Sequence, residues 1–172
     1  MSLFVVDVES DGGLLGENSM VCFGVVKLTP ELDTTFYGKT KPISDQYDER
    51  ALAVSGFSRE EHLKFDDPVK VMSDFADWLE ENCKGRPILI SDNNGYDASW
   101  INYYFLRYYG ANPFGWSSRR IGDLYCGAER DMFYSWKKHR KSPHNHNPVS
   151  DAMGNAEALL HLSKEYGIKL PK

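Results

Sequence analysis

The chain has 172 residues, of which 41% are hydrophobic and 26% are charged. This composition is typical of a globular domain that can bury its own core, and it excludes a fibrous repeat or a largely disordered chain. The formal net charge of −5 at pH 7 excludes a protein that attracts polyanions through a high overall positive charge. We therefore expect one globular domain spanning residues 1–172.

The cysteines and the apolar segments give a first indication of the compartment. Cys22, Cys83 and Cys126 are odd in number and widely separated, and no C-x-x-C pair suggests a zinc site or a redox couple. Met1 leads into an apolar segment without a basic leader, and no apolar run reaches transmembrane length. We expect reduced structural thiols in a cytoplasmic protein that does not enter a membrane.

Three strands are predicted in the first part of the chain, at Leu3–Glu9, Met20–Leu28 and Thr34–Thr40, because these segments are rich in β-branched residues or alternate in polarity. The glycine-containing segment Ser10–Ser19 is a hairpin-like loop between the first two strands. The polar stretch Pro42–Arg59 then predicts a long excursion before the first helix.

The first helix is predicted to begin with Asp67 as N-cap and Pro68 at the first helical position. Its apolar residues fall on one face, which we expect to pack on the sheet. A short buried strand, Pro87–Ile90, then leads into a helix over Asp97–Gly110, ended by its glycine. A buried strand feeding a helix indicates an α/β architecture.

The last third is predicted to contain a strand at Arg119–Leu124, followed by a helix that continues to about Trp136. The segment Lys137–Pro148 is basic, rich in histidine and prone to turns. Ser150 is predicted to open a final helix that ends near Gly167.

Asp7 and Glu9 lie two residues apart at the end of the first strand, so their side chains share one face while Val6 and Val8 point to the other. Two carboxylates on one face repel each other unless a hard cation neutralises them. Taken alone, such a pair is more often a solvent-exposed face than a metal site.

Asp97 stands at the predicted start of a helix after a short buried strand. An aspartate there usually caps the helix or interacts with its dipole. Asp92, at the end of the same strand, is a rival candidate for a functional acid.

His146 and Asp151 stand five residues apart, with the histidine on a loop and the aspartate in the first turn of the last helix. Both side chains could converge on one site. A lone histidine here, near His139 and His144, would more often be an ordinary surface or capping group.

In this order, the residues resemble the three motifs of the DnaQ-like (DEDDh) 3′-5′ exonucleases. The matching segments are Phe4-Val5-Val6-Asp7-Val8-Glu9, Asn94-Gly95-Tyr96-Asp97 and His146-Asn147-Pro148-Val149-Ser150-Asp151-Ala152. The order and setting of the motifs are much more specific than any one of them. Two departures stand out: Asp11 separates Ser10 from Gly12 where the family often has Thr-Gly, and Pro148 replaces an alanine that often follows the histidine.

The resemblance covers nearly the whole chain and implies a ribonuclease-H-like α/β fold, with a central mixed five-stranded sheet flanked by helices. It also implies phosphodiester hydrolysis with two divalent ions, Mg²⁺ or Mn²⁺. Asp7, Glu9, Asp97 and Asp151 would ligate the ions, and His146 would be the general base. Two such ions would offset most of the negative charge where a substrate phosphate must approach.

Within the family, the chain looks most similar to compact stand-alone bacterial exoribonucleases. This likeness favours RNA with a free 3′ end over DNA and, because the family includes dimers, allows a homodimer. Ser10, Gly56, Phe57 and Trp100 are the predicted substrate-binding residues, the two aromatic side chains being candidates for stacking on bases or for core packing. A basic cluster could contact phosphates or be a solvated face: Arg119, Arg120, Lys137, Lys138, Arg140 and Lys141.

Three alternatives remain at this point. The chain could be a 3′-5′ exodeoxyribonuclease, because no residue announces a contact with a 2′-hydroxyl group. It could be a non-catalytic nucleic-acid-binding module on the same fold, although all five motif residues are present. A haloacid-type phosphatase would need an aspartate nucleophile in a D-x-D setting, which Glu9 does not suit.

Overall fold

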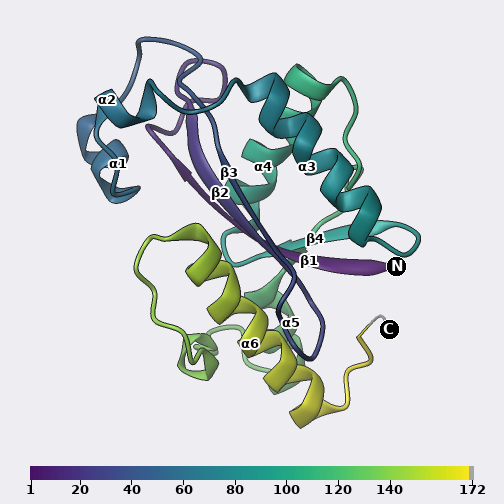
Figure 1. Cartoon of the computed structure of the whole chain (residues 1–172). Helices are drawn as coiled ribbons and strands as arrows, with labels where there is room; N and C mark the ends of the chain where they lie inside the picture. The colour runs from purple at the N-terminus through teal and green to yellow at the C-terminus, as the bar shows by residue number, and fades with distance from the viewer. Residues whose placement is uncertain (171–172) are drawn as a thin grey trace.

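A computed structural model describes residues 1–170 and shows a mixed sheet between two layers of helices (Figure 1). Within these residues the sheet has five strands in the order β3-β2-β1-β4-β5. The strands are β1 (Ser2–Ser10), β2 (Met20–Lys27), β3 (Thr35–Lys39), β4 (Pro87–Ser91) and β5 (Arg119–Arg120). β1, β2 and β3 pair antiparallel, whereas β4 and β5 continue the sheet in parallel. This topology is the ribonuclease-H-like arrangement that the sequence predicts.

The helices follow the strands in a simple order along the chain. They are α1 (Glu49–Val54), α2 (Arg59–His62), α3 (Pro68–Asn82), α4 (Asn94–Tyr104), α5 (Ile121–Glu129) and α6 (Pro148–Tyr166). A π-helical segment, Phe105–Tyr109, extends α4 and ends at Gly110, which has a left-handed backbone. A short 3-10 helix, Lys137–His139, precedes the loop that leads into α6.

The alternation of side chains along β1 separates an apolar face from a functional one. Val6 and Val8 point into a large core beneath α3 and α4. Asp7 and Glu9 therefore belong to the opposite face, where α5 and α6 pack on Val5 and its neighbours. The two acids thus lie on the side of the sheet that α6 covers.

Gly24 allows α6 to reach this face. In the register of β1 and β2, Gly24 is the partner of Asp7. A Cβ atom at Gly24 would overlap the backbone of Pro148 and Val149, the first residues of α6. The missing side chain therefore lets the N-terminus of α6 settle directly beside Asp7.

Several predicted boundaries differ from the structure. The predicted strand Arg119–Leu124 is wrong beyond Arg120, because α5 begins at Ile121. Ile121 and Tyr125 lie one helical turn apart, and both are buried against the sheet. The helix does not continue to Trp136 either, since it ends at Glu129 and is followed by a left-handed residue, Arg130.

The other differences between prediction and structure concern the residues at which helices begin. α6 begins at Pro148 rather than Ser150, because the side chain of Asn147 accepts hydrogen bonds from the backbone of the first turn. α4 begins at Asn94, three residues before the predicted start at Asp97. The stretch Pro42–Arg59 contains α1, and α2 also precedes the helix predicted as the first.

The cysteines and the membrane prediction can be compared with the structure directly. Within residues 1–170, Cys22, Cys83 and Cys126 are free thiols. In the same part of the chain, no helix combines the length and apolar character needed to cross a bilayer.

Replacing Gly24 by alanine should destabilise the protein, because the new methyl group has only helix backbone to displace. We expect a loss of at least about 1–3 kcal/mol in the free energy of unfolding, as for other overpacked sites. Urea titration measures this loss. Gly127→Ala is the control, because an added Cβ there meets no atom of the described chain within 4 Å, and equal stability of the two variants would contradict the packing argument.

Candidate active site

Four buried or half-buried carboxyl groups from three elements meet at the carboxyl end of β1. Asp7 and Glu9 come from the strand, Asp97 from the first turn of α4, and Asp151 from the first turn of α6. One carboxylate oxygen from each of Asp7, Glu9 and Asp151 lies within 4.8 Å of the others. The structure therefore brings together the acids that the sequence singles out.

Asp97 joins this group through β1 rather than by capping its helix. Its Oδ1 accepts a hydrogen bond from the backbone N–H of Val8, at 3.2 Å. Its Oδ2 is buried and has no hydrogen-bond partner in the part of the chain that the structure describes. The rival acid Asp92 instead pairs with Lys137, at 2.9 Å.

Without a cation, the charged forms of these carboxyl groups are electrostatically unfavourable. Burial, followed by the charges of Asp97, Asp151 and Glu9, raises the pKa of Asp7 well above its usual value. Burial raises the pKa of Asp97 to about 7. It also raises the pKa of Glu9, against the opposing effect of His146. These carboxyl groups hold protons more tightly than exposed ones do.

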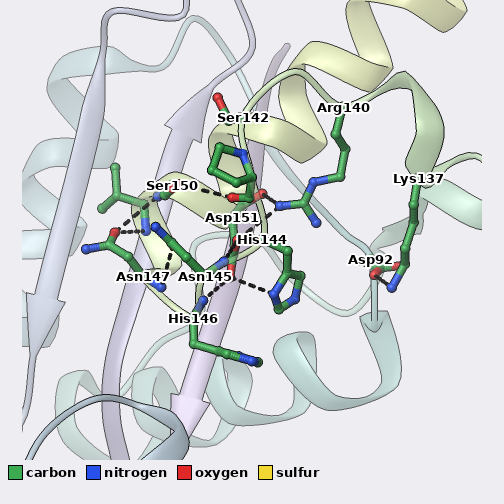
Figure 2. A network of polar contacts seen from close by, with 12 residues as sticks. Asp92, Lys137, Arg140, Ser142, His144, Asn145, His146, Asn147, Ser150 and Asp151 are labelled. Atoms are coloured by element: carbon green, nitrogen blue, oxygen red, sulfur yellow. Dashed lines mark hydrogen bonds and ion pairs between the residues drawn. The ribbon is translucent and has the colours of Figure 1, made fainter.

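Asp151 organises the loop that precedes α6 (Figure 2). Its Oδ1 accepts hydrogen bonds from the N–H of Asn145, at 3.2 Å, and from Nη2 of Arg140, at 3.0 Å. Its Oδ2 accepts one from the N–H of His146, at 2.9 Å. The carboxylate thus fixes the backbone of the histidine loop as well as contributing to the acidic group.

Arg140 is the positive charge built into the site. Its side chain is only 7% exposed, and that of Asp151 is 1% exposed. Gly154 provides the room, since a Cβ there would lie 2.6 Å from Nε of Arg140. The guanidinium group therefore crosses α6 to reach Asp151, and its charge opposes the rise in the pKa of Asp7.

His146 projects from a strained position of the loop. Its backbone is left-handed, with φ of +59°, an uncommon conformation for a residue other than glycine. Its Nδ1 lies 3.4 Å from Oε1 of Glu9, while the side chain remains 49% exposed. Pro148 does not disturb this loop, because it occupies the first position of α6, and Asn147 before it is extended.

The donor set fits hard divalent cations. All the convergent groups of Asp7, Glu9, Asp97 and Asp151 are carboxylate oxygens, which Mg²⁺ and Mn²⁺ prefer. The unpartnered Oδ2 of Asp97 and the mutual repulsion at Asp7 are both features that a bound cation would relieve.

Comparison with known proteins shows the family. No protein-family model matches the sequence. Cap18 of Escherichia coli, a 3′-5′ DNA exonuclease, is 34% identical over 173 residues, which cover 92% of this chain and 90% of Cap18. The chain belongs to the DEDDh 3′-5′ exonucleases. Enzymes of this family use two divalent metal ions, as the acidic group indicates.

Solved structures of other exonucleases share the fold. The nuclease domain of 3′hExo, a DEDDh family member bound to rAMP, superposes with a TM-score of 0.79 at 15% identity, over 99% of this chain and 96% of that domain. Exonuclease I of Escherichia coli in complex with a dA16 oligonucleotide gives 0.71 at 16% identity, over 96% of this chain and 41% of the other. These likenesses extend the resemblance to the fold.

Of the predicted substrate-binding residues, Ser10 lies beside the acidic group. It borders an open hollow of about 400 Å³ that is also lined by Gly12, Gly13, Asp48, Arg50, Ala51 and Tyr96. The hydroxyl group of Ser10 hydrogen-bonds with that of Tyr96. Sequence reasoning did not single out Arg50 or Tyr96, although Tyr96 directly precedes Asp97.

The aromatic candidates have packing roles. Trp100, a residue of α4, is 1% exposed and belongs to the hydrophobic core. The prediction that Trp100 stacks on bases is therefore wrong. Phe57 packs edge-on against Phe65, with ring centres 4.9 Å apart, and belongs to a small cluster under α1. Gly56 ends α1 with a left-handed backbone, at φ of +78°. Neither Gly56 nor Phe57 lines the hollow beside Ser10.

Several members of the basic cluster form ion pairs within the protein. Arg140 is buried against Asp151, Lys137 pairs with Asp92, and Arg120 pairs with Asp123. Arg119, Lys138 and Lys141 remain exposed without such a pair among the described residues, and Nζ of Lys138 lies over the ring of Tyr134. The buried Arg140 is therefore the member of the cluster that is least available to a substrate phosphate.

Asp11, the departure from the family pattern, anchors the loop after β1. Its side chain is fully buried and accepts a hydrogen bond from Nη1 of Arg59, at 3.0 Å. Nδ1 of His62, also fully buried, lies 3.7 Å from the same oxygen. The extra acid therefore ties the loop to α2 and does not join the metal-binding group.

His62 should make the protein less stable in mild acid. Burial, then the charge of Arg59, lowers its pKa from 6.5 to about 4. Between these pH values, His62 is protonated in the unfolded chain but neutral in the folded chain. The free energy of unfolding therefore falls as the pH drops from about 6.5 to about 4, by at most about 3 kcal/mol. Urea unfolding of the wild type and His62→Phe across this range measures the effect, and parallel pH curves would rule it out.

Arg140→Ala should destabilise the cation-free protein strongly, because it leaves a buried carboxylate uncompensated. We expect a loss of about 3–5 kcal/mol with a chelator present, and a smaller loss in Mg²⁺ because the ion replaces the missing charge. Chemical denaturation under both conditions makes the comparison. Lys137→Ala is the matched control, since its pair with Asp92 is partly exposed and should contribute at most about 1 kcal/mol. An Arg140→Ala deficit that Mg²⁺ leaves unchanged would contradict this role.

Proposed function

We propose that this exonuclease removes nucleotides one at a time from the 3′ end of single-stranded DNA and releases nucleoside 5′-monophosphates. The convergence of Asp7, Glu9 and Asp151 on one face of the sheet carries the proposed chemistry. The choice of DNA rests on Cap18, a DNA exonuclease that is similar over 92% of this chain. It replaces the preference for RNA that the likeness to compact exoribonucleases suggests.

The four acids are the proposed ligands of two metal ions. Asp7, Glu9 and Asp151 would hold the first, and Asp7 and Asp97 would hold the second. When bound, such a pair supplies Lewis acidity for the phosphate and a more acidic water. Asp97 remains tied to β1 through the N–H of Val8, which keeps its carboxylate aimed at the site.

His146 is the proposed general base. Nδ1 faces Glu9, so a proton on Nδ1 is stabilised by that carboxylate and Nε2 is left as the basic nitrogen. The half-exposed ring can take a proton from a water and return it to solvent. The hydrogen bond from its backbone N–H to Asp151 holds the backbone of the base close to the metal-binding acids.

The terminal nucleotide would lie in the hollow beside Ser10. This hollow adjoins the carboxyl end of β1 and presents the aromatic ring of Tyr96 and the positive charge of Arg50. An aromatic face suits a base, and a guanidinium group suits a phosphate.

RNA is the second candidate substrate. The nuclease domain of 3′hExo, which has the same fold, was solved bound to rAMP. A pocket that admits a ribonucleotide is therefore compatible with this fold. Rates of degradation of DNA and RNA strands of the same sequence decide between the two substrates.

The direct test is to incubate the purified chain and Mg²⁺ or Mn²⁺ with 5′-labelled single strands of DNA and RNA of the same sequence. We expect a ladder of DNA products shortened from the 3′ end, which a 3′-terminal phosphate should weaken. Endonucleolytic fragments would contradict the mechanism. Shortening of RNA alone would overturn the choice of DNA.

Variants separate the proposed roles in the same assay. His146→Ala should reduce the rate by about 10²–10⁴-fold while metal binding persists, because only the proton acceptor is lost. Asp7→Asn should abolish activity and also weaken metal binding measured by calorimetry. Asp92→Asn is the matched control, since Asp92 pairs with Lys137 outside the acidic group. Normal turnover by Asp7→Asn or His146→Ala would refute the assignment.

A further inference from the structure

A second group of potential metal ligands lies on the outer side of Asp151. One nitrogen of His144, one nitrogen of His146 and one oxygen of Asp151 lie within 4.8 Å of one another. Sequence reasoning used His146 as the base and gave His144 no role. The two rings meet edge to face, with centres 4.6 Å apart.

One distance in this group matches the spacing of ligands in a tetrahedral site. Bonds of about 2.1 Å from zinc to nitrogen and oxygen place neighbouring ligand atoms roughly 3.4 Å apart. Nδ1 of His144 lies 3.5 Å from Oδ2 of Asp151 (Figure 2). This pair therefore already has the spacing that a shared ion requires.

The oxygen of Asp151 has an acceptor direction to spare on this side. Arg140 and the N–H of Asn145 use Oδ1, whereas Oδ2 accepts a hydrogen bond from the N–H of His146. A carboxylate oxygen has about two acceptor directions. Nδ1 of His144 lies 3.5 Å from this oxygen, so the remaining direction of Oδ2 serves either an ion of the acidic group or an ion held together with His144.

The histidine rings are free enough to complete the site. Their side chains are 45% and 49% exposed, so both rings have room to turn toward a common ion. Asp151 is rigid by contrast, since it is buried at the start of α6. Glu9, 3.4 Å from Nδ1 of His146, adds negative charge nearby.

The chemistry of this group differs from that of the acidic group. Two imidazoles and one carboxylate suit zinc and similar transition ions, whereas all-oxygen sets suit Mg²⁺ and Mn²⁺. We propose that His144, His146 and Asp151 form a zinc-type site whose occupation inhibits the exonuclease by withdrawing His146 and one oxygen of Asp151 from the reaction. The inhibitory consequence rests on the proposed function, whereas binding of the ion does not.

Direct binding tests the site without relying on activity. Co²⁺, a visible probe for zinc, is titrated into the wild type with Mg²⁺ present to occupy the remaining oxygen sites at Asp7, Glu9 and Asp97. We expect the intense absorption of four-coordinate Co²⁺, which one equivalent of Zn²⁺ should remove. Only weak six-coordinate absorption from the wild type would overturn the site.

His144→Gln is the decisive variant, because His144 has no part in the proposed hydrolysis. It should lose the absorption and bind Zn²⁺ at least about tenfold more weakly in calorimetry, the effect of removing one of three ligands. His139→Gln is the matched control. His139 stacks on His161 and Tyr125 instead of joining the group, so this variant should bind as the wild type does.

The activity arm tests inhibition. In Mg²⁺ alone, His144→Gln should hydrolyse substrate at the wild-type rate, and it should need at least about tenfold more Zn²⁺ for half inhibition, matching the loss of affinity. Equal zinc binding and equal inhibition in the wild type and His144→Gln, with thermal melting showing both folded, would overturn the inference. An inactive wild type that still binds Co²⁺ through His144 would contradict the proposed function and support the metal site.

Discussion

The repulsion between carboxylates gathered at the end of β1 is the constraint on which the rest of the site depends. Asp7 is surrounded by Asp97, Asp151 and Glu9, and burial adds to the difficulty of charging it. A folded domain is only marginally stable, so a cluster of buried carboxylates persists only if other interactions offset their repulsion. One buried guanidinium, two loop N–H groups and the N–H of Val8 do so within the protein. Divalent cations complete the balance, and the site therefore selects for them.

Two glycines provide the room that the site needs. Gly24 allows the start of α6 to rest against β2, and Gly154 allows Arg140 to cross the same helix. A side chain at Gly24 would push α6 away from β2, and one at Gly154 would displace the guanidinium group of Arg140. The two glycines lie far from each other in sequence and in different elements. Their common effect is to bring Asp151 to Asp7 while keeping a positive charge behind it.

Sequence patterns predict the parts of this arrangement that depend on local periodicity. The alternation around Val6 and Val8 is enough to place Asp7 and Glu9 on one face, whereas the ribonuclease-H-like fold is implied by the resemblance to the DEDDh motifs. The segment after Arg120 misleads because its apolar residues fit a short strand as well as a helix, and packing of Tyr125 decides the outcome. The roles of Trp100 and Asp11 depend on their burial, and the proximity of His144 to Asp151 depends on the path of the loop before α6. None of these can be seen in a short window of sequence.

Asp151 combines two tasks that most metal ligands keep separate. Its carboxylate belongs to the acidic group, and it also holds the backbone of Asn145 and His146 in place. An inactive form made by changing Asp151 would therefore disturb the loop together with the metal, whereas Glu9 accepts no backbone hydrogen bond among the described contacts. For trapping a nucleic acid in an undistorted site, Glu9 is the better residue to neutralise.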